Sequence, residues 1–203
     1  AIAVIRLSGE GCIALVERIY KSPAGKQLQE AAANTVHFGR IMEKGEIVDE
    51  VLVTIFHAPH SFTGEESVEI ACHGSVYIQQ RLLKLLIDTG ARLATPGEFT
   101  QRAFLNGKMD LSQAEAVADL IASSSAASHR MAINQMKGGF SAELMKLRAE
   151  LLRITSLLEL ELDFSEEDVE FADRSELLRL AGNIEALLER LCRSFSLGNV
   201  IKN

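Results

Sequence analysis

The sequence predicts an α+β fold, with a small mixed-sheet domain over residues 1–108 and an all-α helical-bundle segment over residues 109–203. Two observations lead to this division. Before residue 109, short runs of β-branched and apolar residues are separated by glycine-rich turns, in a rough order βαββ-βαβ. After residue 109 nothing has the pattern of a strand, and apolar residues recur at spacings of three and four.

The first half opens with a strand over Ile2–Leu7. Apolar residues occupy both faces of this run, so we expect it in the centre of its sheet. Ser8-Gly9-Glu10-Gly11 then turns the chain into a helix that ends near Tyr20. The remaining elements expected in this half are strands at 35–42 and 47–56 with a hairpin loop at 43–46, a strand at 67–73, a helix at 76–88 and a short strand at 91–94.

The second half opens with a capping-box pattern at Ser112 and Glu115, which predicts the start of a helix that runs to about Lys137. Two helices with broad apolar stripes follow, separated by an acidic connector at 163–173. Two such helices cannot bury these stripes against each other alone, so further helices or another subunit are expected. The stripes are Phe140, Leu144, Leu147, Leu151, Ile154 and Leu158, and then Leu177, Leu180, Ile184, Leu187, Leu191 and Phe195.

Composition and short motifs exclude several functions. The net charge of −7 gives no general attraction for nucleic acid. The sequence contains no phosphate-binding glycine loop, no metal-ligand spacing and no nucleophile elbow. Its three cysteines are far apart, which is typical of reduced thiols in a cytoplasmic protein, and no run spans a membrane. We therefore predict no catalytic residue and no metal site in these 203 residues.

Four stretches carry a resemblance that covers the whole chain. "PGEFTQRAFLNGKMDLSQAEAVADLI" begins at Pro96 and is similar to the signature of the bacterial tRNA modification GTPase family MnmE, also called TrmE. Three further blocks resemble the same family and occur in its order: "AIAVIRLSG" (1–9), "SFTGEESVEIACHG" (61–74) and "DFSEEDVEF" (163–171).

The resemblance implies a specific function. The family acts with the flavoprotein MnmG to modify carbon 5 of the wobble uridine in certain tRNAs. Its N-terminal domain resembles tetrahydrofolate-binding enzymes, holds a one-carbon folate such as 5-formyltetrahydrofolate, and forms the homodimer. A G domain inserted in the helical domain hydrolyses GTP with potassium and magnesium. Its phosphate-binding loop is expected after Asn203, and a further strand is expected before Ala1, so these residues alone should not hydrolyse GTP.

Three residues match family positions that bind the folate. Glu69 is expected to accept hydrogen bonds from the guanidine-like edge of the pterin, and Arg6 to donate to carbonyl or carboxylate groups. Lys108 is expected to reach the ligand from a loop. Each also has an ordinary interpretation: a solvated sheet face for Glu69, a surface ion pair for Arg6 and a solvated loop for Lys108.

Glu98 and Arg102 are spaced i, i+4, which predicts a helical ion pair that anchors the Pro-Gly turn.

Two alternative functions stay open at this stage. The chain could be a folate-dependent protein of the aminomethyltransferase type that shares only the N-terminal fold, or a helical interaction module without a ligand.

Overall fold

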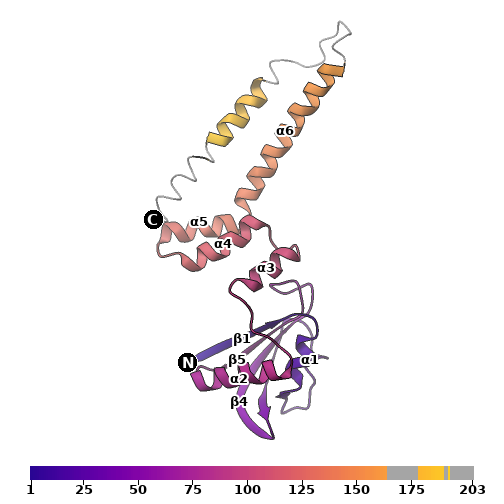
Figure 1. Cartoon of the computed structure of the whole chain (residues 1–203), viewed down its shortest axis with the longest axis vertical. Helices are drawn as coiled ribbons and strands as arrows, with labels where there is room; N and C mark the ends of the chain where they lie inside the picture. Colours follow the sequence, from indigo (N-terminus) through magenta and orange to yellow (C-terminus); the bar gives the residue numbers. More distant parts are fainter. Residues whose placement is uncertain (164–177, 190–191, 193–203) are drawn as a thin grey trace. The chain divides into compact units, whose positions relative to one another are not determined.

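The computed structural model describes residues 1–163, 178–189 and Cys192 (Figure 1). The chain divides into two compact units, Ala1–Met109 and Asp110–Asn203. The first unit contains a sheet with helices, and the described part of the second unit is helical. The predicted α+β class is therefore confirmed.

The sheet of the first unit has five strands in the order β1-β5-β4-β3-β2. The sequence had indicated a mixed sheet. Instead, every pairing among the described strands is antiparallel. The strands are β1 Ile2–Ser8, β2 Tyr20–Lys21, β3 Thr35–Glu43, β4 Glu46–Phe56 and β5 Ser67–His73.

Two strand predictions are wrong. β1 lies at the edge of the sheet rather than in its centre, and Ile2 is 81% exposed. The apolar residues on its two faces have different surroundings. Leu7 faces the core, whereas Ile2 and Val4 lie on the opposite face of the sheet and are exposed. Residues 91–94 form no strand and instead continue the loop that leads to Glu98.

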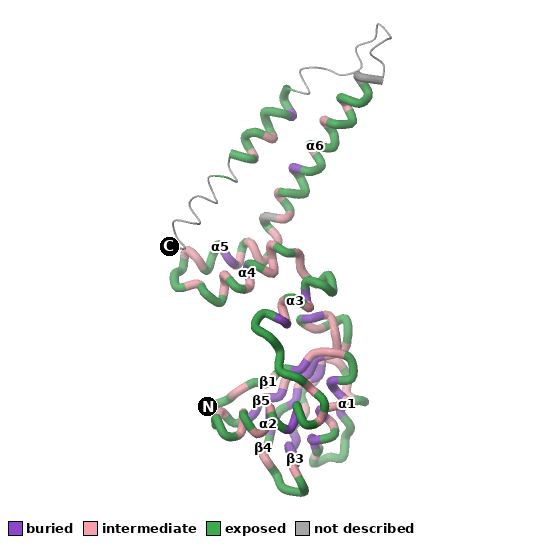
Figure 2. Tube along the Cα trace, in the orientation of Figure 1, coloured by how far each residue is buried: buried purple, intermediate pink, exposed green. Residues whose placement is uncertain are grey.

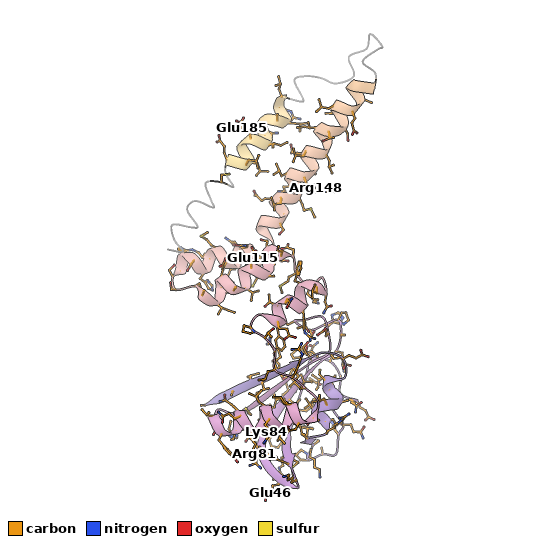
Figure 3. All side chains as sticks on the ribbon, viewed as in Figure 1. Glu46, Arg81, Lys84, Glu115, Arg148 and Glu185 are labelled. Atoms are coloured by element: carbon orange, nitrogen blue, oxygen red, sulfur yellow. The ribbon has the colours of Figure 1, made fainter. Side chains whose placement is uncertain are left out.

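Two helices cover one face of the sheet, and the core lies between them and the strands (Figure 2). α1 covers Cys12–Glu17, which is shorter than expected because the chain enters β2 at Tyr20. α2 covers Val76–Thr89, close to the prediction. Arg81 of α2, labelled in Figure 3, donates to the carboxylate of Glu43 and so ties the helix to the end of β3. α3, Glu98–Leu105, was not predicted as a separate element.

The β3–β4 hairpin confirms the predicted loop. Lys44 and Gly45 both have positive φ, the conformation that the right-handed twist of a two-residue hairpin favours. On β3, Gly39 is required by close packing. A Cβ atom added there would lie 2.1 Å from the ring of Tyr20, whose hydroxyl donates to the carbonyl of Phe38 at 2.8 Å.

The other face of the sheet is open and carries a row of apolar side chains. The strand register aligns Val4 with Ala71, Ala71 with Leu52, and Leu52 with Phe38. Val4, Leu52 and Phe38 are 58%, 47% and 51% exposed. The next row on the same face contains Arg6 and Glu69. We call this surface the open sheet face.

The second unit begins with α4 Leu111–Ala122, α5 Ala126–Met136 and α6 Gly139–Asp163. The predicted single helix from Ser112 to Lys137 is wrong, because the chain leaves helical geometry at Ser123 and Ser125 caps a new helix. The predicted N-cap is also wrong. Asp110 accepts from the N–H of Gln113, and the Gln113 side chain accepts from the N–H of Asp110.

Both predicted striped helices are seen in part. Residues 178–189 are helical, and α6 contains the first stripe. Leu147 and Leu180 are buried, whereas Leu144, Leu151 and Leu158 are 42–48% exposed. The described helices also carry charged side chains such as Arg148 and Glu185 (Figure 3). Residues 164–173 of the acidic connector lie outside the described part of the chain.

Candidate functional site

Arg6 and Glu69 lie directly opposite each other on β1 and β5. The alternation of β5 places Val68 and Ile70 in the core and Glu69 on the open sheet face, as the sequence predicted. Nε of Arg6 donates to Oε1 of Glu69 at 2.8 Å, and Nη2 contacts the same oxygen. The Arg6 and Glu69 side chains are 43% and 28% exposed, so solvent reaches both partners of this ion pair.

Two aromatic rings from different segments flank the Arg6 guanidinium. Its central carbon lies 5.8 Å from the ring centre of Phe62 and 5.8 Å from that of Phe99. Phe62 comes from the loop between β4 and β5, and Phe99 from the first turn of α3. Both distances fall within the range of cation–π attraction. The strand register and the two rings together hold Arg6 beside Glu69.

Lys108 follows α3 in the chain, and its side chain packs against the β4–β5 loop, which carries Phe62. Its ammonium donates to the carbonyl oxygen of Pro59 at 3.0 Å. Its aliphatic stem lies against Gly64, where an added Cβ would be 3.2 Å from Cγ and Cδ of the lysine. Asn106 fixes the approach, since its side-chain amide donates to the carbonyl of Thr63 at 2.8 Å. These contacts hold Lys108 against the β4–β5 loop, the segment whose Phe62 contacts Arg6.

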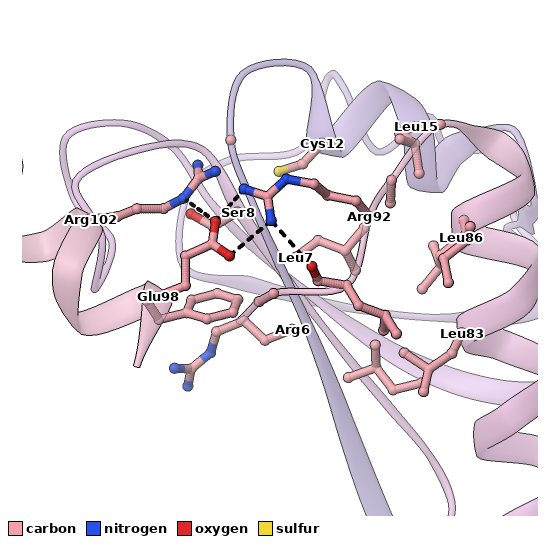
Figure 4. A pocket seen from close by; sticks show the side chains of 18 of the residues that line it. Arg6, Leu7, Ser8, Cys12, Leu15, Leu83, Leu86, Arg92, Glu98 and Arg102 are labelled. Carbon is pink, nitrogen blue, oxygen red and sulfur yellow. Dashed lines mark hydrogen bonds and ion pairs between the residues drawn. The ribbon is translucent and has the colours of Figure 1, made fainter. Parts of the chain in front are cut away.

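Glu98 is the centre of an ionic cluster that joins three segments of the first unit. Its carboxylate lies between the guanidinium groups of Arg92 and Arg102 (Figure 4). It also accepts the backbone N–H of Thr95 at 2.9 Å. Hydrogen bonds from Arg92, then from Thr95, and then from Arg102 hold the pKa of Glu98 far below its usual range. The predicted ion pair with Arg102 is present, but Glu98 is buried and Arg92 is its principal partner.

Arg102 extends this cluster to the β4–β5 loop. Its Nη1 donates to Oε2 of Glu65 at 2.9 Å, and the same oxygen accepts the hydroxyl of Ser8 at 3.1 Å. Ser8 in turn shares hydrogen bonds with the hydroxyls of Thr63 and Ser67, both of which are buried. α3, the β4–β5 loop and the end of β1 are therefore tied together next to Arg6.

A cavity of about 270 Å³ lies beside this cluster. Leu7, Leu83 and Leu86 form part of its apolar wall, and Arg6 is the one residue of the predicted set that lines it (Figure 4). Cys12 also lines the cavity. Burial raises the pKa of its thiol to about 12, with a further contribution from Glu66, so the group stays protonated and unreactive at neutral pH.

The sequence missed the roles of Arg92, Glu65, Phe62 and Phe99. Three of them, Glu65, Phe62 and Phe99, lie in the "SFTGEE" and "PGEFTQR" parts of the two longest family-like blocks. Their place in these blocks is the sequence feature that could have indicated a role. Arg92 lies outside them. Within the described residues, no group of three or more His, Cys, Asp or Glu side chains is placed to hold a metal ion. No helix in the described part of the chain is long and apolar enough to cross a membrane.

Comparison with known proteins defines the class of protein. Residues 1–108 match the family model described as the N-terminus of the GTP-binding protein TrmE, and residues 111–203 match the MnmE helical domain. The chain is thus a TrmE-type N-terminal domain followed by a segment of the MnmE helical-domain type.

Individual relatives agree with these two matches. The chain is 63% identical to the tRNA modification GTPase MnmE of Bacteroides thetaiotaomicron, 59% to that of Porphyromonas gingivalis and 57% to that of Flavobacterium johnsoniae. The alignments cover 99–100% of this chain but only 43–44% of each relative. The chain belongs to the tRNA modification GTPase MnmE family, and it spans less than half the length of these relatives.

Proposed function

We propose that this chain is the folate-binding and dimer-forming portion of a tRNA modification GTPase that acts with MnmG on carbon 5 of the wobble uridine. The observation that carries the proposal is the Arg6–Glu69 pair on the open sheet face, flanked by Phe62 and Phe99. Both charged residues match folate-binding positions of the family. GTP hydrolysis with potassium and magnesium belongs to the proposal for the whole protein, because the 203 residues contain no phosphate-binding loop.

The donor and acceptor set fits a reduced folate such as 5-formyltetrahydrofolate. The Glu69 carboxylate can accept two hydrogen bonds from the N–C–N edge of a pterin. Arg6 and Lys108 supply cations for the carbonyl and carboxylate groups elsewhere on the molecule. Phe62 and Phe99 supply aromatic faces for a flat ring. When bound, the folate supplies the one-carbon unit, and the residues of this chain hold and orient it.

The open sheet face supports the proposed homodimer. Apolar side chains from four strands form a continuous surface, and such surfaces are covered in most soluble proteins. This surface adjoins Arg6 and Glu69, so a second copy that covers it would lie next to the ligand. A cytoplasmic location follows from the proposed tRNA substrate.

The helical half argues against the aminomethyltransferase alternative. That alternative shares only the N-terminal fold, whereas residues 111–203 match the MnmE helical domain over their whole length. The other alternative, a helical interaction module without a ligand, gives no reason for Arg6, Glu69 and Lys108 to match folate-binding positions of the family.

Isothermal titration of 5-formyltetrahydrofolate into the 203-residue chain tests the proposal. We expect Glu69→Ala to weaken binding about ten- to a hundredfold, because a hydrogen bond to a charged group contributes roughly 1.5–3 kcal/mol. Glu50→Ala is the matched control, since Glu50 also pairs with an arginine across two strands but lies away from the site. Equal affinities for wild type and Glu69→Ala would remove Glu69 from the site.

A further inference from the structure

Arg6 and Glu69, which are assigned to different parts of the ligand, form a hydrogen-bonded ion pair with each other. Arg6 presents two N–H donors of a planar guanidinium to the carboxylate of Glu69. The edge of a pterin that a carboxylate recognises is also a planar guanidine, made of the ring N3–H and the 2-amino group. Glu69 therefore already holds, from its own chain, a group of the same chemical type as the one it is expected to bind.

We infer that Arg6 is an internal competitor for the ligand site, and that folate binds by exchange. In the ligand-free chain the Arg6 guanidinium occupies Glu69. When the pterin edge takes its place, Arg6 is released to meet a carbonyl or carboxylate on the rest of the ligand. This inference rests on the proposed function and deepens it, because it makes Arg6 a determinant of specificity.

The geometry favours such an exchange. Nε and Nη2 of Arg6 both contact Oε1, so the pair does not use the two-oxygen fork that makes arginine–carboxylate pairs strongest. The side chains are 43% and 28% exposed, and ion pairs of this exposure contribute little. A ligand can therefore displace Arg6 at small cost. The remaining restraint comes from Phe62 and Phe99, each 5.8 Å from the guanidinium carbon.

The same two rings favour an aromatic ligand over an aliphatic amidine. A flat ring bound at Glu69 meets the aromatic faces that Arg6 contacts now. The exchange also distinguishes a complete folate from a bare pterin. Both must displace Arg6, but only the folate carries the benzoyl carbonyl and glutamate carboxylates that the released guanidinium can then bind.

The test compares two ligands on the 203-residue chain. One is 5-formyltetrahydrofolate, and the other is 6-methyltetrahydropterin, which keeps the guanidine-like edge but has no acidic tail. In Arg6→Ala we expect the pterin to bind about two- to fivefold more tightly, because its competitor is gone. We expect the folate to bind about tenfold or more weakly, because its partner is gone. These opposite changes are the signature of the exchange.

Arg6→Gln, which keeps part of the aliphatic stem, should show the same pair of changes and guards against a folding defect in the alanine variant. Arg40→Ala is the matched control, since Arg40 pairs with Glu50 across β3 and β4 at 3.0 Å, and it should change neither affinity. Pterin affinity that is unchanged or reduced in both Arg6 variants overturns the exchange while leaving the folate site intact. Folate affinity that is unchanged in Glu69→Ala overturns the proposed function itself.

Discussion

Glu98 illustrates how one buried carboxylate organises the surroundings of the site. Arg92, the N–H of Thr95 and Arg102 all donate to it, and Arg102 also reaches Glu65. These contacts join the loop before α3, α3 itself and the β4–β5 loop. Because Phe99 lies beside Glu98 and contacts Arg6, the ionic cluster also fixes one aromatic wall of the candidate site.

The lowered pKa of Glu98 predicts a specific pH dependence of stability. The folded pKa lies below the unfolded value, so this carboxylate stabilises the fold fully above its unfolded pKa of about 4.3. That contribution is lost as the pH falls below this value toward the folded pKa. We expect Glu98→Gln to lower the urea midpoint at neutral pH and to flatten its decline between about pH 5 and pH 3.

The matched control for this experiment is Glu50→Gln. Glu50 also pairs with an arginine but is 48% exposed, so its removal should barely change the midpoint at any pH. Parallel pH profiles for wild type and Glu98→Gln would show that Glu98 does not control acid stability.

At the scale of single elements, helix ends and tight packing decide what the sequence pattern leaves open. Ser112 and Glu115 have the spacing of a capping box, yet Asp110 and Gln113 form the box that is present. The hydroxyl of Ser112 is buried and has no hydrogen-bond partner among the described residues. Asp110 also accepts from Ser141, and this contact together with the N–H of Gln113 lowers its pKa.

The observed cap predicts different effects for two neighbouring substitutions. Asp110→Ala should destabilise the first turn of α4 by about 0.5–2 kcal/mol, because the amides there lose their acceptor. Ser112→Ala should be neutral or slightly stabilising, since it removes an unpaired buried hydroxyl. Hydrogen exchange of the peptide that covers residues 110–122 measures both. Faster exchange in Ser112→Ala than in Asp110→Ala would contradict this assignment.

β3 provides a second prediction at the same scale. Gly39→Ala should destabilise the first unit by about 1–3 kcal/mol, because the new Cβ overlaps the Tyr20 ring. Urea unfolding followed by circular dichroism measures the loss. In a Tyr20→Ala background the same substitution should cost much less, and an undiminished cost there would exclude the ring as the cause.

At the scale of the whole molecule, two apolar surfaces among the described residues offer sites of association. The open sheet face lies in the first unit, and the exposed leucines of α6 lie in the second. We expect the sheet face to hold the dimer, because it is continuous across four strands and adjoins the candidate ligand site. We expect the exposed leucines of α6 to pack against other helices instead.

Substitution of one leucine on each surface distinguishes the two possible interfaces, because the two leucines are almost equally exposed. Leu52 on the open sheet face is 47% exposed, and Leu151 on α6 is 48% exposed. We expect Leu52→Glu to weaken dimerisation roughly tenfold or more, because an unpaired charge buried in an interface costs several kcal/mol. Leu151→Glu should leave dimerisation unchanged. Sedimentation equilibrium at micromolar concentration measures both, and the reverse result would assign the dimer to the helices.

The sequence by itself determined the features that repeat over short distances. The alternation of 67–73 placed Glu69 on the face opposite Val68 and Ile70, and Lys44-Gly45 marked the hairpin. Spacings of three and four separated the helical half from the α+β half. The resemblance added the family and the residues Arg6, Glu69 and Lys108. The alternation, the hairpin and the family follow from local side-chain spacing, conformational preference and long motifs, so the sequence alone is sufficient to identify them, whereas the three ligand-binding residues stay a prediction.

Only the tertiary structure decided which distant groups meet. It placed β1 at the sheet edge, paired Arg6 with Glu69 across 63 positions and brought Arg92 to Glu98. Strand order and register are set by the packing of the whole sheet against α1 and α2, and no local pattern specifies them. The competition between Arg6 and the ligand for Glu69 could therefore be inferred only once both side chains had been placed in space.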